Sequence, residues 1–184
     1  PGLGVGVWLA WKAPARLAER LKPPLQAGQK PWDRAFIALL VLGMHGWLLL
    51  MALDARRTGW DAIPLWGKGL GVLAIAVGYA GIAWVYAYNS FATTVVKLQD
   101  DRGQKVIDSG PYAIVRHPMY AAGVLYLLGP PLILGSVWGL IGVPVAAAMI
   151  AARAVAEERV LAAELEGYAA YRARVRHRLI PGVW

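Results

Sequence analysis

The stretch AFIALLVLGMHGWLLLMAL, from Ala35 to Leu53, decides the class of fold because it contains no formal charge. A helix that crosses the hydrocarbon core of a bilayer needs roughly 20 mostly apolar residues. The stretch comes close to that length, and charged residues bound it on both sides, at Asp33-Arg34 and again from Asp54 to Arg57. The sequence therefore predicts a transmembrane helix at this position.

Three more apolar segments follow along the chain. Gly69 to Tyr88 is rich in Gly, Ala and Val, and small residues of this kind allow membrane helices to approach closely. Met119 to Val137 and Trp138 to Ala152 are joined at Gly135-Ser136 without a polar loop, which predicts a tight C-terminal helical hairpin. Together with a 58% share of hydrophobic residues, these segments predict an all-α, polytopic transmembrane helical protein. We expect a single membrane domain over residues 1–184, with four spans at about 35–53, 69–88, 119–137 and 138–152.

The two ends of the chain add smaller elements. Gly2 to Trp11 is apolar but short, so it predicts either a partial fifth span or a segment at the membrane interface. The chain begins with Pro and not with Met, and we expect further residues before it. Beyond Arg153 the sequence is polar and predicts a cytoplasmic tail helix that runs to about Leu165 and resumes after Gly167.

The distribution of basic residues predicts the orientation. Six Lys and Arg lie in Lys12 to Arg34, four in Asn89 to Arg116 and six in Arg153 to Arg178, whereas the remaining polar loop carries three. Since basic loops stay on the cytoplasmic side, we expect an integral protein of a bacterial inner membrane with these three regions in the cytoplasm. The net charge of +8 lies at helix ends, which favours membrane lipids over nucleic acid as partners.

Two polar clusters flank the hairpin and predict one bipartite site. The first is SGPYAIVRHPMY, from Ser109 to Tyr120, which combines aromatic, cationic and imidazole groups directly before an apolar run. The second contains Arg153, Glu157 and Glu158, and the first two of these share a helix face because they are four residues apart. The chain has no Cys and no evident cage of metal ligands, so we expect neither a Cys nucleophile nor a metal.

The two clusters resemble those of the isoprenylcysteine carboxyl methyltransferase and phospholipid methyltransferase superfamily of integral membrane enzymes. The pattern of that superfamily is a Ser-Gly stretch with aromatic residues, Arg-His-Pro-x-Tyr, a helical hairpin, paired Glu, a Leu and Tyr-x-x-Tyr. Its counterparts here are Ser109-Gly110-Pro111-Tyr112, Arg116-His117-Pro118-Met119-Tyr120, Glu157-Glu158, Leu161 and Tyr168-Ala169-Ala170-Tyr171. Taken alone, Tyr168 and Tyr171 are more typical of an interfacial aromatic belt.

The resemblance implies that S-adenosylmethionine binds between the cytoplasmic loop, the hairpin and the tail, within about residues 95–181. It implies catalytic roles for Arg153 and His117, with Arg153 as the arginine that binds the acceptor. The cofactor-contacting positions that it implies are Gln99, Gln104, Lys105, Val106, Ile107, Tyr112, His117, Pro118, Met119, Tyr120, Glu157 and Glu158.

These residue types suit transfer of a methyl group from a sulfonium, an in-line displacement in which catalysis rests on positioning and solvation. Acidic and aromatic side chains such as Glu157 and Tyr112 attract a cation. Two lipophilic acceptors stay open. A small or prenyl-type acid would present a carboxylate to Arg153, whereas the amine of a phospholipid would have to lose a proton to His117 or Glu158. The position of Arg153 slightly favours the acid.

Two other functions also stay open. The ending from Arg178 to Trp184, RLIPGVW, is similar to that of NADPH-dependent membrane reductases acting on sterols and enones. The short chain and the paired Glu disfavour that alternative. A non-catalytic membrane protein would keep the fold and bind neither cofactor. The sequence predicts neither the identity of the acceptor nor the oligomeric state.

Overall fold

The computed structural model describes residues 29–58, 62–92, 95–96 and 103–184, together with Trp11, Ala18, Leu21 and Pro23. Within these residues the elements are helical, with no strand, so the all-α prediction is confirmed. The predicted partial fifth span, Gly2 to Trp11, lies outside the described residues except for Trp11. The elements are α3 (Pro31–Thr58), α4 (Leu65–Tyr88), the 3-10 helix η2 (Gly110–Ala113), α5 (Pro118–Leu134), α6 (Val137–Glu164) and α7 (Tyr168–Arg174).

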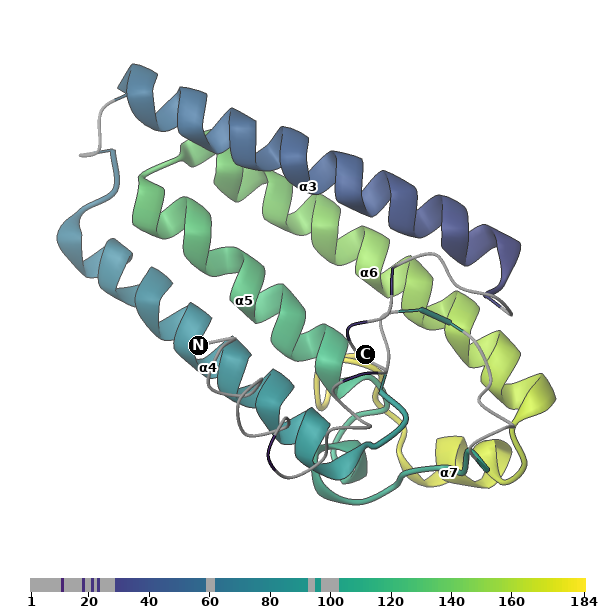
Figure 1. Ribbon diagram of the computed structural model, residues 1–184. Helices are drawn as coiled ribbons and strands as arrows, with labels where there is room; N and C mark the ends of the chain where they lie inside the picture. Colours follow the sequence, from purple (N-terminus) through teal and green to yellow (C-terminus); the bar gives the residue numbers. More distant parts are fainter. Residues whose placement is uncertain are drawn as a thin grey trace.

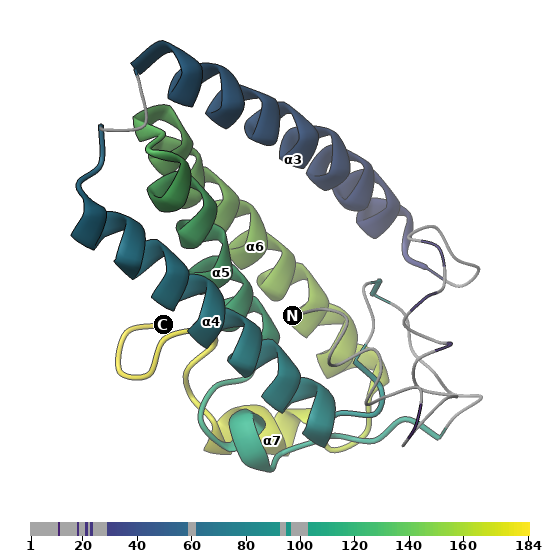
Figure 2. The same cartoon turned by 60° about the vertical axis from the view of Figure 1, so that its left-hand side comes forward.

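The four long helices lie side by side in the spatial order α3, α6, α5, α4 (Figures 1 and 2). α3 and α5 begin at the end of the bundle where α4 and α6 finish, and η2 and α7 gather there as well. We call this the site end and the other the opposite end. The described residues of the three most basic regions, among them Lys30, Arg116 and Arg153, therefore lie at the site end.

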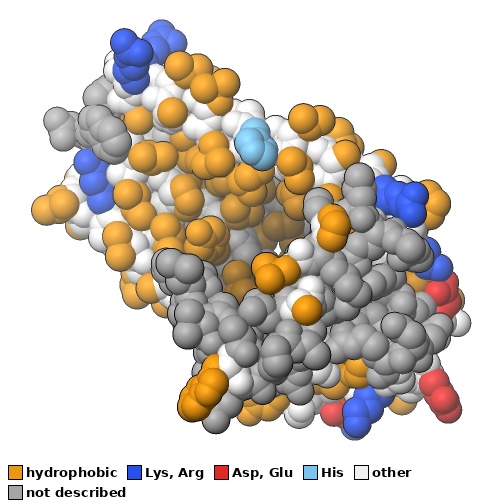
Figure 3. All heavy atoms as spheres, viewed as in Figure 1, with side chains coloured by type: hydrophobic (Ala, Val, Ile, Leu, Met, Phe, Trp, Pro, Cys, Tyr) orange, Lys and Arg blue, Asp and Glu red, His pale blue; other side chains and the backbone are white. Residues whose placement is uncertain are grey.

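The outer surface is that of a membrane protein. α3, α4 and α6 are long and apolar enough to cross a bilayer, and α5 is a shorter apolar helix of 17 residues. Many large hydrophobic side chains point outward, among them Leu42 at 71% exposure and Leu49 at 59%. In the face that Figure 3 displays, hydrophobic side chains cover the middle of the molecule and charged ones lie toward its two ends. An apolar belt between charged ends is what lipid solvation requires.

The helix bounds differ from the predicted spans in an instructive way. Hydropathy marks only the stretch inside lipid, whereas a helix continues into water as long as its residues favour it. α6 thus runs past the predicted end of the span at Ala152 to Glu164, so the tail helix predicted to about Leu165 is confirmed and is continuous with the span. α3 extends past both of its predicted limits. α5 ends at Leu134, earlier than the predicted Val137, because Gly135 adopts a left-handed backbone with φ 73°.

The predicted hairpin between α5 and α6 is confirmed, and α3 fastens its turn. The Ser136 hydroxyl accepts a hydrogen bond from the Gly139 amide (2.9 Å) and so caps α6. The same hydroxyl donates to Asp54 of α3 (2.7 Å), whose carboxylate also accepts from the Trp138 amide (3.1 Å). Asp54 is 5% exposed, so a buried carboxylate holds the opposite end together.

Small residues bring α4 and α5 into close contact, as the sequence predicts. A Cβ added at Gly78 of α4 would lie 2.7 Å from the Tyr126 amide nitrogen of α5. A Cβ at Gly129 of α5 would lie 2.7 Å from the Gly71 carbonyl oxygen of α4. Backbone therefore packs on backbone, which holds the start of α5 and the end of α4 in fixed register at the site end.

Candidate functional site

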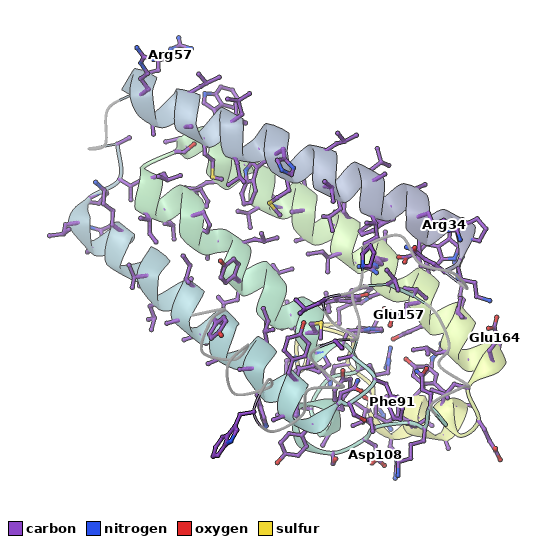
Figure 4. All side chains as sticks on the ribbon, viewed as in Figure 1. Arg34, Arg57, Phe91, Asp108, Glu157 and Glu164 are labelled. Atoms are coloured by element: carbon purple, nitrogen blue, oxygen red, sulfur yellow. The ribbon has the colours of Figure 1, made fainter. Side chains whose placement is uncertain are left out.

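A pocket lies at the site end, between the end of α4, the start of α5, the polar part of α6 and residues 104–107. It encloses about 940 Å³ of empty space including its open mouth. Figure 4 locates Glu157, Phe91 and Asp108 at this end and Arg57 at the opposite one. Nine of the residues predicted for the site line the pocket, namely Gln104, Lys105, Val106, Ile107, Tyr112, His117, Met119, Tyr120 and Glu157.

The start of α5 presents two stacked rings to the pocket. Pro118 occupies the first turn of the helix, where its missing N–H is not needed, and His117 is therefore the N-cap residue. The rings of His117 and Tyr120 stack with centroids 5.4 Å apart and planes 7° from parallel. The Tyr120 hydroxyl donates a hydrogen bond of 2.6 Å to Glu157 of α6, which fixes that carboxylate at the pocket wall.

The neighbouring Glu158 is not among the pocket-lining residues and lies at the centre of an ion-pair cluster. It is 2% exposed, and its carboxylate accepts hydrogen bonds from Arg116 Nε (2.6 Å) and Arg178 Nε (3.0 Å). His117 Nε2 lies 3.3 Å from the same carboxylate. The C-terminal segment also pairs through its backbone, since the amides of Arg116 and His117 donate to the carbonyls of residues 177 and 178. Glu158 thus fastens the tail to the start of α5.

Arg153 lies one helical turn before Glu157 and outside the set of pocket-lining residues. Its Nη2 is 3.0 Å from Asp33 Oδ1 of α3, and the side chains are 9% and 0% exposed. The guanidinium also lies over the rings of Phe36 (5.1 Å) and Tyr120 (5.7 Å). The arginine predicted to bind an acceptor is therefore already paired with a carboxylate.

Two other predicted residues also fail to line the pocket. Pro118 lies outside the set of pocket-lining residues, and Gln99 is outside the described residues.

Tyr112 of η2 forms another part of the wall. Asn89, which caps the C-terminus of α4, donates from its side-chain amide to the Tyr112 hydroxyl (2.7 Å). Burial raises the pKa of Tyr112 to about 12, with a smaller opposing contribution from the Asn89 hydrogen bond and a nearby Glu157 charge adding to the rise. The phenol thus stays neutral near pH 7.

Tyr168 and Tyr171 of α7 line the pocket too, and the prediction of an interfacial belt is wrong for both. They are 3% and 2% exposed, and the Tyr171 hydroxyl donates to the Tyr112 carbonyl (2.9 Å). Burial raises the pKa of each above its usual value. Among the described residues, the buried Tyr168 hydroxyl has no hydrogen-bond partner. Since buried polar groups are nearly always satisfied, this hydroxyl is suited to meet a ligand.

Sequence reasoning also missed the apolar part of the pocket. It comes from the segment after α4 and from one face of α6, and its members include Phe91, Ala92, Val95, Val96, Val160 and Leu165. Glu157 is followed at helical spacing by Val160 and Leu161, three and four residues later. This periodicity is the one signal in the sequence that could have marked this face of α6.

Comparison with family models gives a match over the central part of the chain. A family model described as phospholipid methyltransferase matches residues 66–166, which is more than half of the 184 residues. The match begins at the first turn of α4 and ends just before α7, so it contains both polar clusters and the hairpin between them. No curated protein matches the chain.

Proposed function

Because the chain belongs to the phospholipid methyltransferase family, we propose that it transfers a methyl group from S-adenosylmethionine to a lipophilic acceptor at the cytoplasmic face of its membrane. When bound, S-adenosylmethionine supplies an electrophilic methyl group on a sulfonium. The observation that carries the proposal is a carboxylate, Glu157, held at the wall of a membrane-interface pocket and surrounded by aromatic rings.

The pocket wall fits both ends of this cofactor. Glu157 can pair with a sulfonium or an ammonium, and the rings of Tyr112 and Tyr120 offer π faces to the same cations. The apolar face of α6, with Val160 and Leu161, suits a flat adenine ring. The Tyr168 hydroxyl supplies a buried donor that needs an acceptor. These features support S-adenosylmethionine as the cofactor.

The position of the pocket at one end of the helix bundle supports a lipophilic acceptor at the cytoplasmic face of the membrane. The described residues of the three basic regions, which the positive-inside rule assigns to the cytoplasm, lie at the site end. Apolar helix surface lies directly next to it, so an acceptor can keep its chain in lipid while its headgroup reaches the pocket. The side chains around the pocket exclude water. This favours methyl transfer from the sulfonium, because the reaction moves charge between the methyl donor and the acceptor.

Of the two acceptors, the structure favours an amine over a carboxylate. The case for an acid rests on Arg153, and its guanidinium is paired with Asp33 at 3.0 Å. An amine acceptor reacts through its nitrogen lone pair and has to release a proton to a base. His117 and Glu157 are the titratable groups at the wall beside Tyr120. Glu158 is a poor base, because it has cationic side chains on both carboxylate oxygens.

A binding measurement separates this proposal from its rivals. The detergent-solubilised protein is heated with S-adenosylmethionine, with S-adenosylhomocysteine or with NADPH. A ligand at 100 times its dissociation constant stabilises the folded state by about 2.7 kcal/mol, a shift that is easily measured. We expect stabilisation by the first two and none by NADPH. Stabilisation by NADPH alone would favour the reductase, and a response to none of them would favour the non-catalytic alternative.

The acceptor is then identified by its product. Membranes containing the protein are incubated with S-adenosylmethionine labelled in the methyl group, and the labelled lipids are separated. Glu157→Gln tests the site, and Glu164→Gln is the matched control, because Glu164 lies on the same helix but is paired with Lys30 at the surface. We expect label in an amine-bearing lipid, reduced by the first substitution and unchanged by the second.

A further inference from the structure

Asp33, in the first turn of α3, is a fully buried carboxylate that the sequence does not mark as part of the site. It is 0% exposed. Its Oδ2 accepts hydrogen bonds from the Gln29 side-chain amide (2.8 Å) and from the Val96 amide (2.8 Å), and its Oδ1 faces Arg153 Nη2. A buried charge is costly unless it is paired, so this carboxylate and Arg153 depend on one another.

The Asp33–Arg153 pair lies directly behind the pocket wall. Val96, whose amide donates to Asp33, lines the pocket. Tyr120, whose ring lies under the Arg153 guanidinium, lines it as well and donates its hydroxyl to Glu157. One layer of side chain therefore separates the pair from the space next to Glu157, where the proposed function puts the reacting groups.

The pair decides the net charge that an incoming headgroup meets. An arginine without its carboxylate would attract an anionic headgroup bidentately. With Asp33 at 3.0 Å the two charges cancel, so a carboxylate gains little from Arg153 and is repelled by Glu157. A headgroup that is neutral or positive at its reacting atom meets no such penalty. Discrimination here works by removing an attraction for the wrong ligand.

We propose that Asp33 is the residue that sets the charge preference of the acceptor site, by neutralising Arg153 so that an amine is accepted and a carboxylate is rejected. The inference rests on the proposed function and adds a specificity-determining residue to it. Asp33 acts through Arg153, so its role is in positioning and electrostatics.

The test uses two probes that share one hydrocarbon chain, oleylamine and oleic acid. Their dissociation constants are measured on the detergent-solubilised full chain saturated with S-adenosylhomocysteine, which prevents turnover. Asp33→Asn removes the negative charge beside Arg153. One unit charge about 10 Å away at an effective dielectric constant of about 20 changes the affinity of a charged probe by about tenfold, so the acid is expected to bind about tenfold more tightly and the amine about tenfold more weakly, which shifts their ratio toward the acid by about 100-fold. Arg153→Gln leaves the negative charge and is expected to shift the ratio toward the amine.

Asp54→Asn is the matched control. Asp54 is a second buried carboxylate of α3, but it pairs with Ser136 and Trp138 at the opposite end. This variant is expected to keep the wild-type ratio even if it lowers stability. An unchanged ratio in Asp33→Asn would overturn the inference, and if that variant does not fold, the absence of a shift toward the amine in Arg153→Gln would do so. The inference would also be overturned if the wild type bound neither oleylamine nor oleic acid.

The two proposals fail in different ways. Stabilisation of the wild type by S-adenosylhomocysteine is recorded on the same samples. If it is absent, the proposed function is wrong. If it is present and the affinity ratio does not respond to Asp33 or Arg153, the proposed function stands and the role of Asp33 is wrong.

Discussion

The two adjacent glutamates of α6 make different contacts, and exchanging each for glutamine tests this division. Glu158 is 2% exposed and is held by Arg116 Nε at 2.6 Å and Arg178 Nε at 3.0 Å. Removing one partner of a buried ion pair costs about 3–5 kcal/mol. We take the lower limit, about 3 kcal/mol, because the Arg178 side chain is 24% exposed and can find water instead.

This loss of stability is large enough to measure by thermal unfolding in detergent. For a chain of this length, 1 kcal/mol corresponds to about 2–4 °C, so Glu158→Gln is expected to lower the melting temperature by about 6–12 °C. Glu157→Gln removes one side-chain acceptor at the pocket wall and is expected to change the melting temperature by no more than about 4 °C, the effect of a net hydrogen bond of about 1 kcal/mol.

Ligand binding should show the opposite ranking of the two variants, with Glu157→Gln affected more than Glu158→Gln. It is measured by calorimetry with S-adenosylhomocysteine and S-adenosylmethionine. A charge-assisted contact contributes about 1.5–3 kcal/mol, so Glu157→Gln is expected to weaken S-adenosylmethionine about 10- to 100-fold. Glu164→Gln is the control for both measurements. The reasoning is refuted if Glu158→Gln melts within about 2 °C of the wild type, or if Glu157→Gln destabilises the fold as much as Glu158→Gln does.

Three further predictions address other parts of the molecule. Tyr168→Phe removes a hydroxyl that has no partner among the described residues, so it should leave the melting temperature unchanged and weaken the binding of S-adenosylmethionine about fivefold. Tyr171→Phe breaks a hydrogen bond to Tyr112 and should lower the melting temperature by about 2–4 °C. Gly78→Leu should destabilise the α4–α5 contact by more than about 2 kcal/mol, since even a Cβ would lie 2.7 Å from backbone; a melting temperature equal to that of the wild type would contradict the close packing. Because the pKa of Tyr112 is raised from 10.0 to about 12, the neutral phenol is favoured in the fold, and the stability it contributes is present below pH 10 and lost as the pH rises toward 12; phenolate absorbance that titrates fully near pH 10 in the folded protein would contradict this.

The sequence predicts the helices because the hydropathy of a segment indicates whether it lies in lipid or in water. The uncharged run from Ala35 to Leu53 can only be buried in lipid or protein, and α3 follows from it. The hairpin is predicted as well, since Gly135 and Ser136 are a C-terminal stop and an N-cap in succession. The end of α6 at Glu164 agrees with the tail helix predicted to about Leu165, whereas both ends of α3 lie beyond the predicted span, because polar helix in water has no hydropathy signal.

The site is predicted in part for a similar reason. A motif supplies residue types, and the geometry decides which neighbour each one meets. Successive residues of a helix point about 100° apart, so Glu157 faces the pocket and Glu158 faces the tail, a difference that the paired letters do not contain. The partner of Arg153 is Asp33 on another helix, and no local pattern connects the two. Tyr168 and Tyr171 could have been found, because their spacing of three after Gly167 puts both rings on one face of a short helix.

The order of charges along α6 gives the proposed reaction a direction. Arg153 and Glu157 are one turn apart, about 6 Å along the helix axis, with Arg153 on the side of the lipid-embedded part and Glu157 on the side of the polar end. A methyl donor paired with Glu157 and a headgroup beside the Arg153–Asp33 pair would then meet end to end, as an in-line displacement requires of reacting atoms about 3–3.5 Å apart. Tyr120 lies at that junction, because its hydroxyl binds Glu157 while its ring lies under the Arg153 guanidinium. One side chain of α5 therefore contacts both charged groups of α6.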